Sequence, residues 1–250
     1  HSSNIGSARM ALEAGSDFQR RFMGRLGMLD SPTLELPEVG APQVPSPWRE
    51  INTITISFGH GLSVTPAQLM AGTVALVNGG IFHPLTLTHR PDGTPVPGEI
   101  VLKQKTSAHM RNLMRMVVTE GTGKKADVPG YEVGGKTGTA DKQAGGGYNV
   151  RAVISSFVGA FPMNDPRYVV LAVVDDPKGD KGTYGYVTGG WIAAPVVQAV
   201  IGRMGPLFGV QPVPGGEEAE DNPGHPLYVP MPREPKRTAM LTGDVRHAAF

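Results

Sequence analysis

Residues 133–140 read Val-Gly-Gly-Lys-Thr-Gly-Thr-Ala. This segment sets one lysine, Lys136, beside two threonine hydroxyls, and its glycines let another molecule approach the backbone closely. Such a combination is typical of a strand edge that binds an acyl substrate. A second polar motif, Ser2-Ser3-Asn4, precedes a helical pattern, and its hydroxyl and amide can face a common cleft with the first motif.

Residues 130–137 also fit the spacing of a phosphate-binding loop: glycine, four residues, glycine, lysine, threonine. Such a loop must leave a buried strand and open a helix, so that backbone N–H groups meet the phosphates. Here residues 123–129 are too polar for a buried parallel strand, and the downstream Gly145-Gly146-Gly147 cannot sustain a helix. The context therefore argues against nucleotide binding.

Composition narrows the class of protein. The 250 residues are 40% hydrophobic and 18% charged, enough for one core or for one lobe of a larger domain. A net charge of +1 without a basic run gives no case for nucleic acid, and the lack of cysteine excludes disulfides and thiolate catalysis. The seven histidines form no close ligand pair, so we expect neither a metal site nor a cofactor, and no apolar run is long enough to span a bilayer.

Periodicity and turn residues predict an α+β fold, with an antiparallel sheet flanked by helices. Thr65-Pro66 is a strong helix start, and Ser3-Asn4 is another cap. Ile51–Ile56 alternates apolar and polar side chains, as a strand does, until Gly59-His60-Gly61 breaks the pattern. The expected helices are two short ones up to Gly27 and those at 66–77, 107–118 and 191–204, and the expected strands are 132–139, 151–161 and 167–174.

Two regions differ in character. Residues 1–209 carry the periodic elements, whereas 210–250 are proline-rich with few aliphatic side chains and cannot bury enough apolar surface to offset the entropy of ordering. We therefore expect one folded region and a disordered tail. Because the first residues already belong to the edge of a helix, we also expect the chain to be a fragment whose amino-terminal part is missing.

The order and spacing of the motifs over residues 1 to about 205 resemble the class B penicillin-binding proteins, and more closely the division-specific peptidoglycan transpeptidases. The resemblance implies the penicillin-binding, serine β-lactamase-like fold, incomplete at its N-terminus. The motifs that carry it are Ser2-Ser3-Asn4-Ile5-Gly6, Phe58-Gly59-His60-Gly61-Leu62-Ser63-Val64-Thr65-Pro66, Gly121-Thr122-Gly123, Lys136-Thr137-Gly138-Thr139-Ala140, Gly147-Tyr148, the loop from Asp176-Pro177 to Gly189-Gly190, and Ala193-Ala194-Pro195-Val196.

The chemistry implied is acyl transfer: a serine attacks the D-Ala-D-Ala carbonyl of one stem peptide, D-alanine leaves, and an amine of a neighbouring stem takes the acyl group. β-Lactams acylate the same serine. The family carries this nucleophile in a Ser-x-x-Lys tetrad before the Ser-x-Asn motif, and no such tetrad occurs in these 250 residues. We therefore expect the fragment alone to be inactive. A catalytically inactive homologue that serves as a binding or sensing module, and a serine β-lactamase, remain alternatives.

Four residues are candidates for catalysis. The Ser2 hydroxyl can relay a proton to the leaving nitrogen, and the Asn4 amide can bond the substrate's peptide group. Lys136 supplies positive charge near Ser2 and the substrate carboxylate, and the backbone N–H of Thr139 is the expected second oxyanion donor.

Three further residues are candidates for substrate binding. Thr137, like Thr139, can donate its hydroxyl to the terminal carboxylate, Gly138 leaves room for the substrate along the strand, and Tyr148 walls the acyl pocket. Other polar or aromatic residues are expected to be structural: His60 between glycines, Asp175-Asp176 on opposite strand faces, and Trp191 in the core.

By the same resemblance, the partners are stem peptides, β-lactams, a membrane glycan polymerase and divisome proteins. The expected location is the periplasmic side of the inner membrane, with an anchor helix that these residues do not contain.

Overall fold

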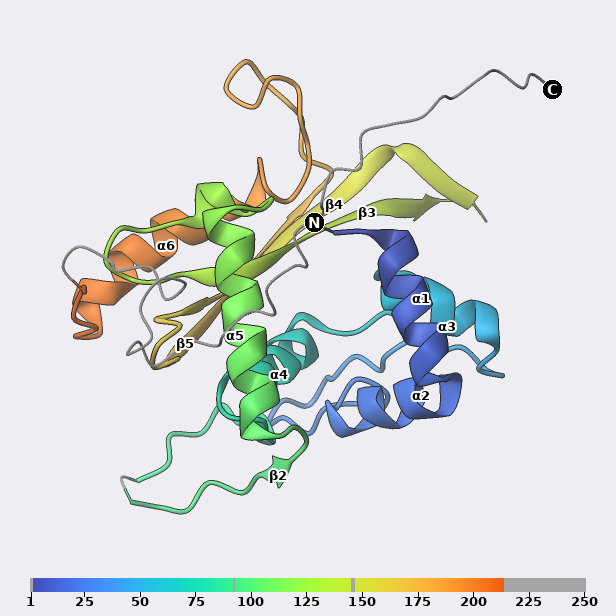
Figure 1. Cartoon of the computed structure of the whole chain (residues 1–250), viewed down its shortest axis with the longest axis horizontal. Helices are drawn as coiled ribbons and strands as arrows, with labels where there is room; N and C mark the ends of the chain where they lie inside the picture. Colours follow the sequence, from blue (N-terminus) through green and yellow to red (C-terminus); the bar gives the residue numbers. More distant parts are fainter. Residues whose placement is uncertain (1, 92, 145–146, 214–250) are drawn as a thin grey trace, which may run out of the picture.

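The computed structural model describes residues 2–91, 93–144 and 147–213 (Figure 1). Its elements confirm an α+β architecture with antiparallel strands and flanking helices. In chain order they are α1 (Asn4–Ala14), α2 (Ser16–Arg25), α3 (Glu50–Ser57), α4 (Pro66–Val77), β1 (Ile81–Phe82), β2 (Glu99–Ile100), α5 (Gln104–Thr119), the 3-10 turn η1 (Lys124–Ala126), β3 (Gly134–Ala144), β4 (Gly147–Phe161), β5 (Tyr168–Asp175) and α6 (Ala193–Leu207).

The main sheet has the order β3-β4-β5, with both pairs antiparallel, as expected for consecutive strands with short connections. Lys136 lies opposite Val158 and Gly138 opposite Ser156. Since β3 is an edge of this sheet within the described residues, one row of its backbone groups is not paired by β4. The Lys-Thr-Gly-Thr segment is therefore presented on an open strand edge.

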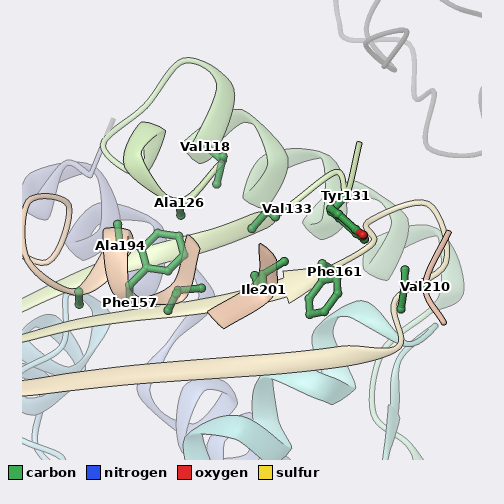
Figure 2. Close-up of a cluster of buried hydrophobic side chains, with 11 residues drawn as sticks. Val118, Ala126, Tyr131, Val133, Phe157, Phe161, Ala194, Ile201 and Val210 are labelled. Carbon is green, nitrogen blue, oxygen red and sulfur yellow. The ribbon is translucent and has the colours of Figure 1, made fainter. Parts of the chain in front are cut away.

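One face of the sheet packs against α6 (Figure 2). The alternation along β4 turns Phe157 and Phe161 to this face, where both rings are 0% exposed beside Val197 and Ile201 of α6. Each fully buried ring contributes about 1.5–3 kcal/mol relative to an exposed one. This buried cluster fixes β4 against α6 on one face of the sheet.

The opposite face packs against α4. Val77 of α4, Met114 of α5, Ala160 of β4 and Met163 form a second buried cluster. Because α5 contributes to both clusters, it joins the two layers at the side of the sheet (Figure 1). The sheet is thus held between helices.

Helix α4 begins where the sequence predicts. Thr65 Oγ1 accepts the N–H of Gln68 at 3.3 Å, and Gln68 Oε1 accepts the N–H of Thr65 at 3.0 Å, which is a complete capping box. The buried Gln68 amide also donates to the carbonyls of Gly27 and Asp30. One side chain therefore starts the helix and ties it to the loop after α2.

Residues 50–57 correct the strand-like interpretation, because they form helix α3. In a helix, residues three apart share a face, and Thr53 and Ile56 are both buried on that face of α3. Thr53 is then fixed by long-range bonds: its hydroxyl donates to Ser16 Oγ at 2.8 Å, and its carbonyl accepts from Gln19 Nε2 at 3.1 Å. Packing against α1 and hydrogen bonds to α2 decide the conformation here.

Two segments remote from the sheet are tied by Glu35. Its exposed carboxylate accepts hydrogen bonds from the Thr86 and Thr88 hydroxyls and from the backbone N–H of Leu87. These bonds, that of Thr86 first, lower the pKa of Glu35 to about 2. The proline-rich excursion after α2 is therefore fastened to the loop that follows β1.

At the C-terminal end of the described chain, the N–H of Val213 donates to the carbonyl of Gly130 at 2.8 Å. Residues 214–250, most of the expected tail, lie outside the described residues. Within 2–91, 93–144 and 147–213, no helix has the length and apolar character needed to cross a bilayer.

Candidate functional site

A cleft of about 870 Å³ runs along β3, and five separate stretches of chain line it, three of which carry residues of the sequence motifs or their neighbours. Ser2 and Asn4 contribute from the start of α1, Lys136–Thr139 from β3, and Ser57–His60 from the end of α3. In Figure 1 the N-terminal end of the chain lies beside β3. The structure therefore brings together six of the seven residues that the sequence singled out.

The start of α1 is capped by Ser3, whose Oγ accepts the N–H of Gly6 at 3.1 Å. This bond satisfies one of the free N–H groups of the first turn. Ser2 and Asn4 are not needed for capping, and both line the cleft. Their hydroxyl and amide are available to another molecule, which is what the Ser-x-Asn motif predicts.

Lys136 is held by its own strand. Its Nζ donates to the carbonyl oxygen of Thr137 at 2.7 Å. Although part of the side chain is open to solvent, the atoms around the ammonium remove it from water and lower the pKa of Lys136. Ser2 lines the same cleft as this ammonium.

The two threonine hydroxyls of the motif are oriented by neighbours. Thr139 Oγ1 accepts the N–H of Gly189 at 3.1 Å, so its own proton remains available for donation. The hydroxyls of Thr137 and Thr122 lie 2.9 Å apart, and since one donates to the other, one proton of this pair also remains available. Together they form a donor set suited to a carboxylate.

Gly138 lies close to the Ser156 side chain of the neighbouring strand β4. A Cβ at this position would lie 2.4 Å from the Oγ of Ser156 on β4. A side chain here would therefore force the Ser156 hydroxyl to move. Room for a substrate along the strand remains a prediction, although Gly138 does line the cleft.

Lys124, Lys125 and Trp191 also line the cleft, and sequence reasoning missed all three. Trp191 corrects the expectation of a core residue: it is only partly buried, and its ring stacks on Tyr186 with a centroid distance of 5.2 Å. The signal that could have found it is its position directly after Gly189-Gly190, the pair that lies against β3.

His60, expected to be structural, lines the cleft as well, and its ring packs edge-on to Phe58 with centroids 5.7 Å apart. Asp175 and Asp176 do not line it. They pair with Lys142 and Lys178 respectively, in keeping with a role in shaping the loop.

The expected role of Tyr148 as a wall of the acyl pocket concerns a side chain outside the described residues. The backbone of Tyr148 pairs with Gln143 at the start of β4, but its side chain lies outside what the structure describes. The described residues gather no group of three or more histidine and carboxylate side chains that could hold a metal ion.

The family model for the penicillin-binding protein transpeptidase domain matches residues 1–202. The chain belongs to this family. The match includes every strand of the main sheet and all the described residues that line the cleft. It confirms the family resemblance on which the motif analysis rests.

The chain is 41% identical over 220 residues to the probable peptidoglycan D,D-transpeptidase FtsI of Caulobacter vibrioides, covering 84% of this chain and 37% of that protein. It also resembles two solved structures. One is the transpeptidase domain of Burkholderia pseudomallei penicillin-binding protein 3, with a TM-score of 0.77, 36% identity, and coverage of 84% of this chain and 63% of that one.

The other is penicillin-binding protein 3 of Mycobacterium tuberculosis complexed with aztreonam, with a TM-score of 0.75 and 28% identity, covering 85% of this chain and 51% of that one. These likenesses confirm the penicillin-binding fold. The chain spans little more than a third of the length of the curated FtsI relative.

Proposed function

We propose that this chain is part of a peptidoglycan D,D-transpeptidase that cross-links stem peptides through a serine acyl-enzyme. The observation that carries the proposal is the convergence of Ser2, Asn4 and the Lys136–Thr139 segment on one cleft. The relatives named as D,D-transpeptidases support it.

The proposed roles follow from the geometry of the donors. The hydroxyl protons left available at Thr139 and at the Thr137–Thr122 pair bind the terminal carboxylate of the substrate. Lys136 adds positive charge near the substrate carboxylate, and the Ser2 hydroxyl, which lines the same cleft, relays a proton to the leaving amine. The Asn4 amide bonds the substrate's peptide group, and the N–H of Thr139 stabilises the oxyanion.

The nucleophile is proposed to be the serine of a Ser-x-x-Lys tetrad that lies in the part of the relatives' length that this chain does not span. No such tetrad occurs among the 250 residues. On this proposal the sequence given is inactive alone, β-lactams acylate the longer protein, and that protein is anchored in the inner membrane with this domain in the periplasm. A glycan polymerase and divisome proteins are its proposed partners.

The experiment measures D-alanine release from a peptide ending in D-Ala-D-Ala by the protein extended upstream to include Ser-x-x-Lys. The isosteric Thr139→Val removes one hydrogen bond to a charged group and should lower kcat/KM about 10- to 100-fold. Thr94→Val, at an exposed turn that does not line the cleft, is the matched control and should leave the rate unchanged.

Two results would contradict the proposal: no D-alanine release by the extended protein, or equal rates for Thr139→Val and Thr94→Val. Absence of release would favour the inactive homologue instead.

A further inference from the structure

The cleft extends beyond the Lys-Thr-Gly-Thr segment, towards η1 and the loop before α6. Lys124 and Lys125 of η1 line this end together with Trp191. None of these three belongs to the motifs with assigned roles. They contribute two ammonium groups and one indole ring to the lining of the cleft.

Lys125 is fixed in place by that ring. Its Nζ lies 4.3 Å from the centroid of Trp191, a favourable cation–π distance. Trp191 is itself held by Tyr186, which stacks on it, and by Tyr184, which meets it edge-on at 5.6 Å. The ammonium is therefore positioned at the cleft by an aromatic ring that accepts none of its hydrogen bonds through an oxygen atom.

Neither Lys124 nor Lys125 forms an ion pair with a described residue, since no described carboxylate lies within ion-pair distance of either ammonium. The nearest acidic residue in sequence, Asp127, is occupied by Arg115 at 2.7 Å. Both positive charges therefore remain uncompensated by the part of the chain that the structure describes.

The charged side chains that line the cleft among the described residues are all positive. Three lysines, Lys124, Lys125 and Lys136, line it, and no Asp or Glu is found among its described lining residues. A single terminal carboxylate beside Lys136, Thr137 and Thr139 uses only one of these three charges. Two further lysines remain among the residues that line the cleft, and no described Asp or Glu lines it beside them.

We infer that Lys124 and Lys125 bind a second carboxylate of the peptide substrate, separate from its terminal carboxylate. This inference rests on the proposed function and names a specificity determinant of the same cleft. The carboxylate belongs either to a side chain of the acyl-donor peptide or to the acyl-acceptor peptide. In both cases the cleft selects acidic peptides over their amidated counterparts.

The test compares two pairs of synthetic peptides by calorimetry on the 250-residue chain. The donor pair ends in D-Ala-D-Ala and carries an upstream side chain that is either a free carboxylate or its amide. The acceptor pair lacks D-Ala-D-Ala and carries a free amine beside the carboxylate or amide. One pair should show about fivefold tighter binding of the acid, and that pair identifies the source of the carboxylate.

Lys124→Gln is the decisive variant, because the Lys124 ammonium forms no ion pair with another described residue, whereas Lys125 also contacts Trp191. It should reduce the acid preference at least about twofold, and the double variant with Lys125→Gln should abolish it. Lys105→Gln, an exposed lysine in the first turn of α5 that does not line the cleft, should leave the preference intact. Added salt should weaken the preference in the wild type.

Equal binding of acid and amide in both pairs would overturn the inference, as would an unchanged preference in the double variant or no binding of any peptide. None of these results alters D-alanine release by the extended protein, so failure of the inference is distinguishable from failure of the proposed function.

Discussion

Gly189→Ala should disrupt the site from outside the motif. A Cβ on Gly189 would lie 2.2 Å from the carbonyl oxygen of Ser156 and 2.5 Å from that of Gly138. Both are backbone atoms of the sheet, which the two buried clusters hold in place. Because real Cβ contacts do not fall below about 3.0 Å, the loop must retreat by about 0.8 Å.

The retreat has two consequences. Steric strain of this kind typically lowers the free energy of unfolding by about 1–3 kcal/mol. It also lengthens the 3.1 Å hydrogen bond from Gly189 N–H to Thr139 Oγ1, which orients the Thr139 hydroxyl. A misplacement near 1 Å can cost about 100-fold in rate, so D-alanine release by the extended protein should fall by up to that factor.

Urea denaturation followed by circular dichroism measures the first effect, and the D-alanine assay measures the second. Gly182→Ala is the matched control in the same loop, since its Cβ would meet only the movable Asp180 Oδ1 at 3.3 Å. That control should stay within about 0.5 kcal/mol of the wild type. If Gly189→Ala and Gly182→Ala unfold at the same urea concentration, the proposed docking of the loop on β3 is refuted.

Three further predictions concern stability. Gly24→Ala in α2 should raise the free energy of unfolding by about 0.4–1 kcal/mol in urea titrations, because its Cβ has room and the unfolded chain loses freedom; a decrease would contradict this. Arg115→Met removes the hydrogen bonds to Asp127 and to the carbonyl of Val133. It should lower the free energy of unfolding by about 1–2 kcal/mol in the same titrations. An unchanged free energy of unfolding would show that these bonds do not stabilise the fold. The pKa of Glu35 is lower folded, at about 2, than its ordinary 4.5, so its stabilisation is present above 4.5 and is lost as pH falls towards 2. The stability difference between wild type and Glu35→Gln should therefore shrink across that window in acid titrations, and a constant difference would argue against it.

The sequence predicted those parts of the fold whose signals are local. Thr65-Pro66 starts α4 because the capping box needs only residues within one turn. The strands β4 and β5 follow from apolar runs separated by a short turn. The site residues of the Lys-Thr-Gly-Thr segment were also found, since they are contiguous and the strand alone brings them to one edge.

Predictions failed where distant contacts decide. Residues 50–57 become a helix because Thr53 bonds to Ser16 and to Gln19, more than 30 residues away in the chain. Trp191 faces the cleft instead of the core because Gly189-Gly190 sets the loop against β3. Neither contact has a signature in the local pattern of apolar and polar residues.

The most direct measurement of the central claim is intact-mass spectrometry after incubation with benzylpenicillin, on the 250-residue chain and on the protein extended upstream to include Ser-x-x-Lys. The account predicts one covalent adduct on the extended protein and none on the 250-residue chain. An adduct on the shorter chain would mean that the nucleophile lies among these residues, and no adduct on either would contradict the proposed acyl-enzyme.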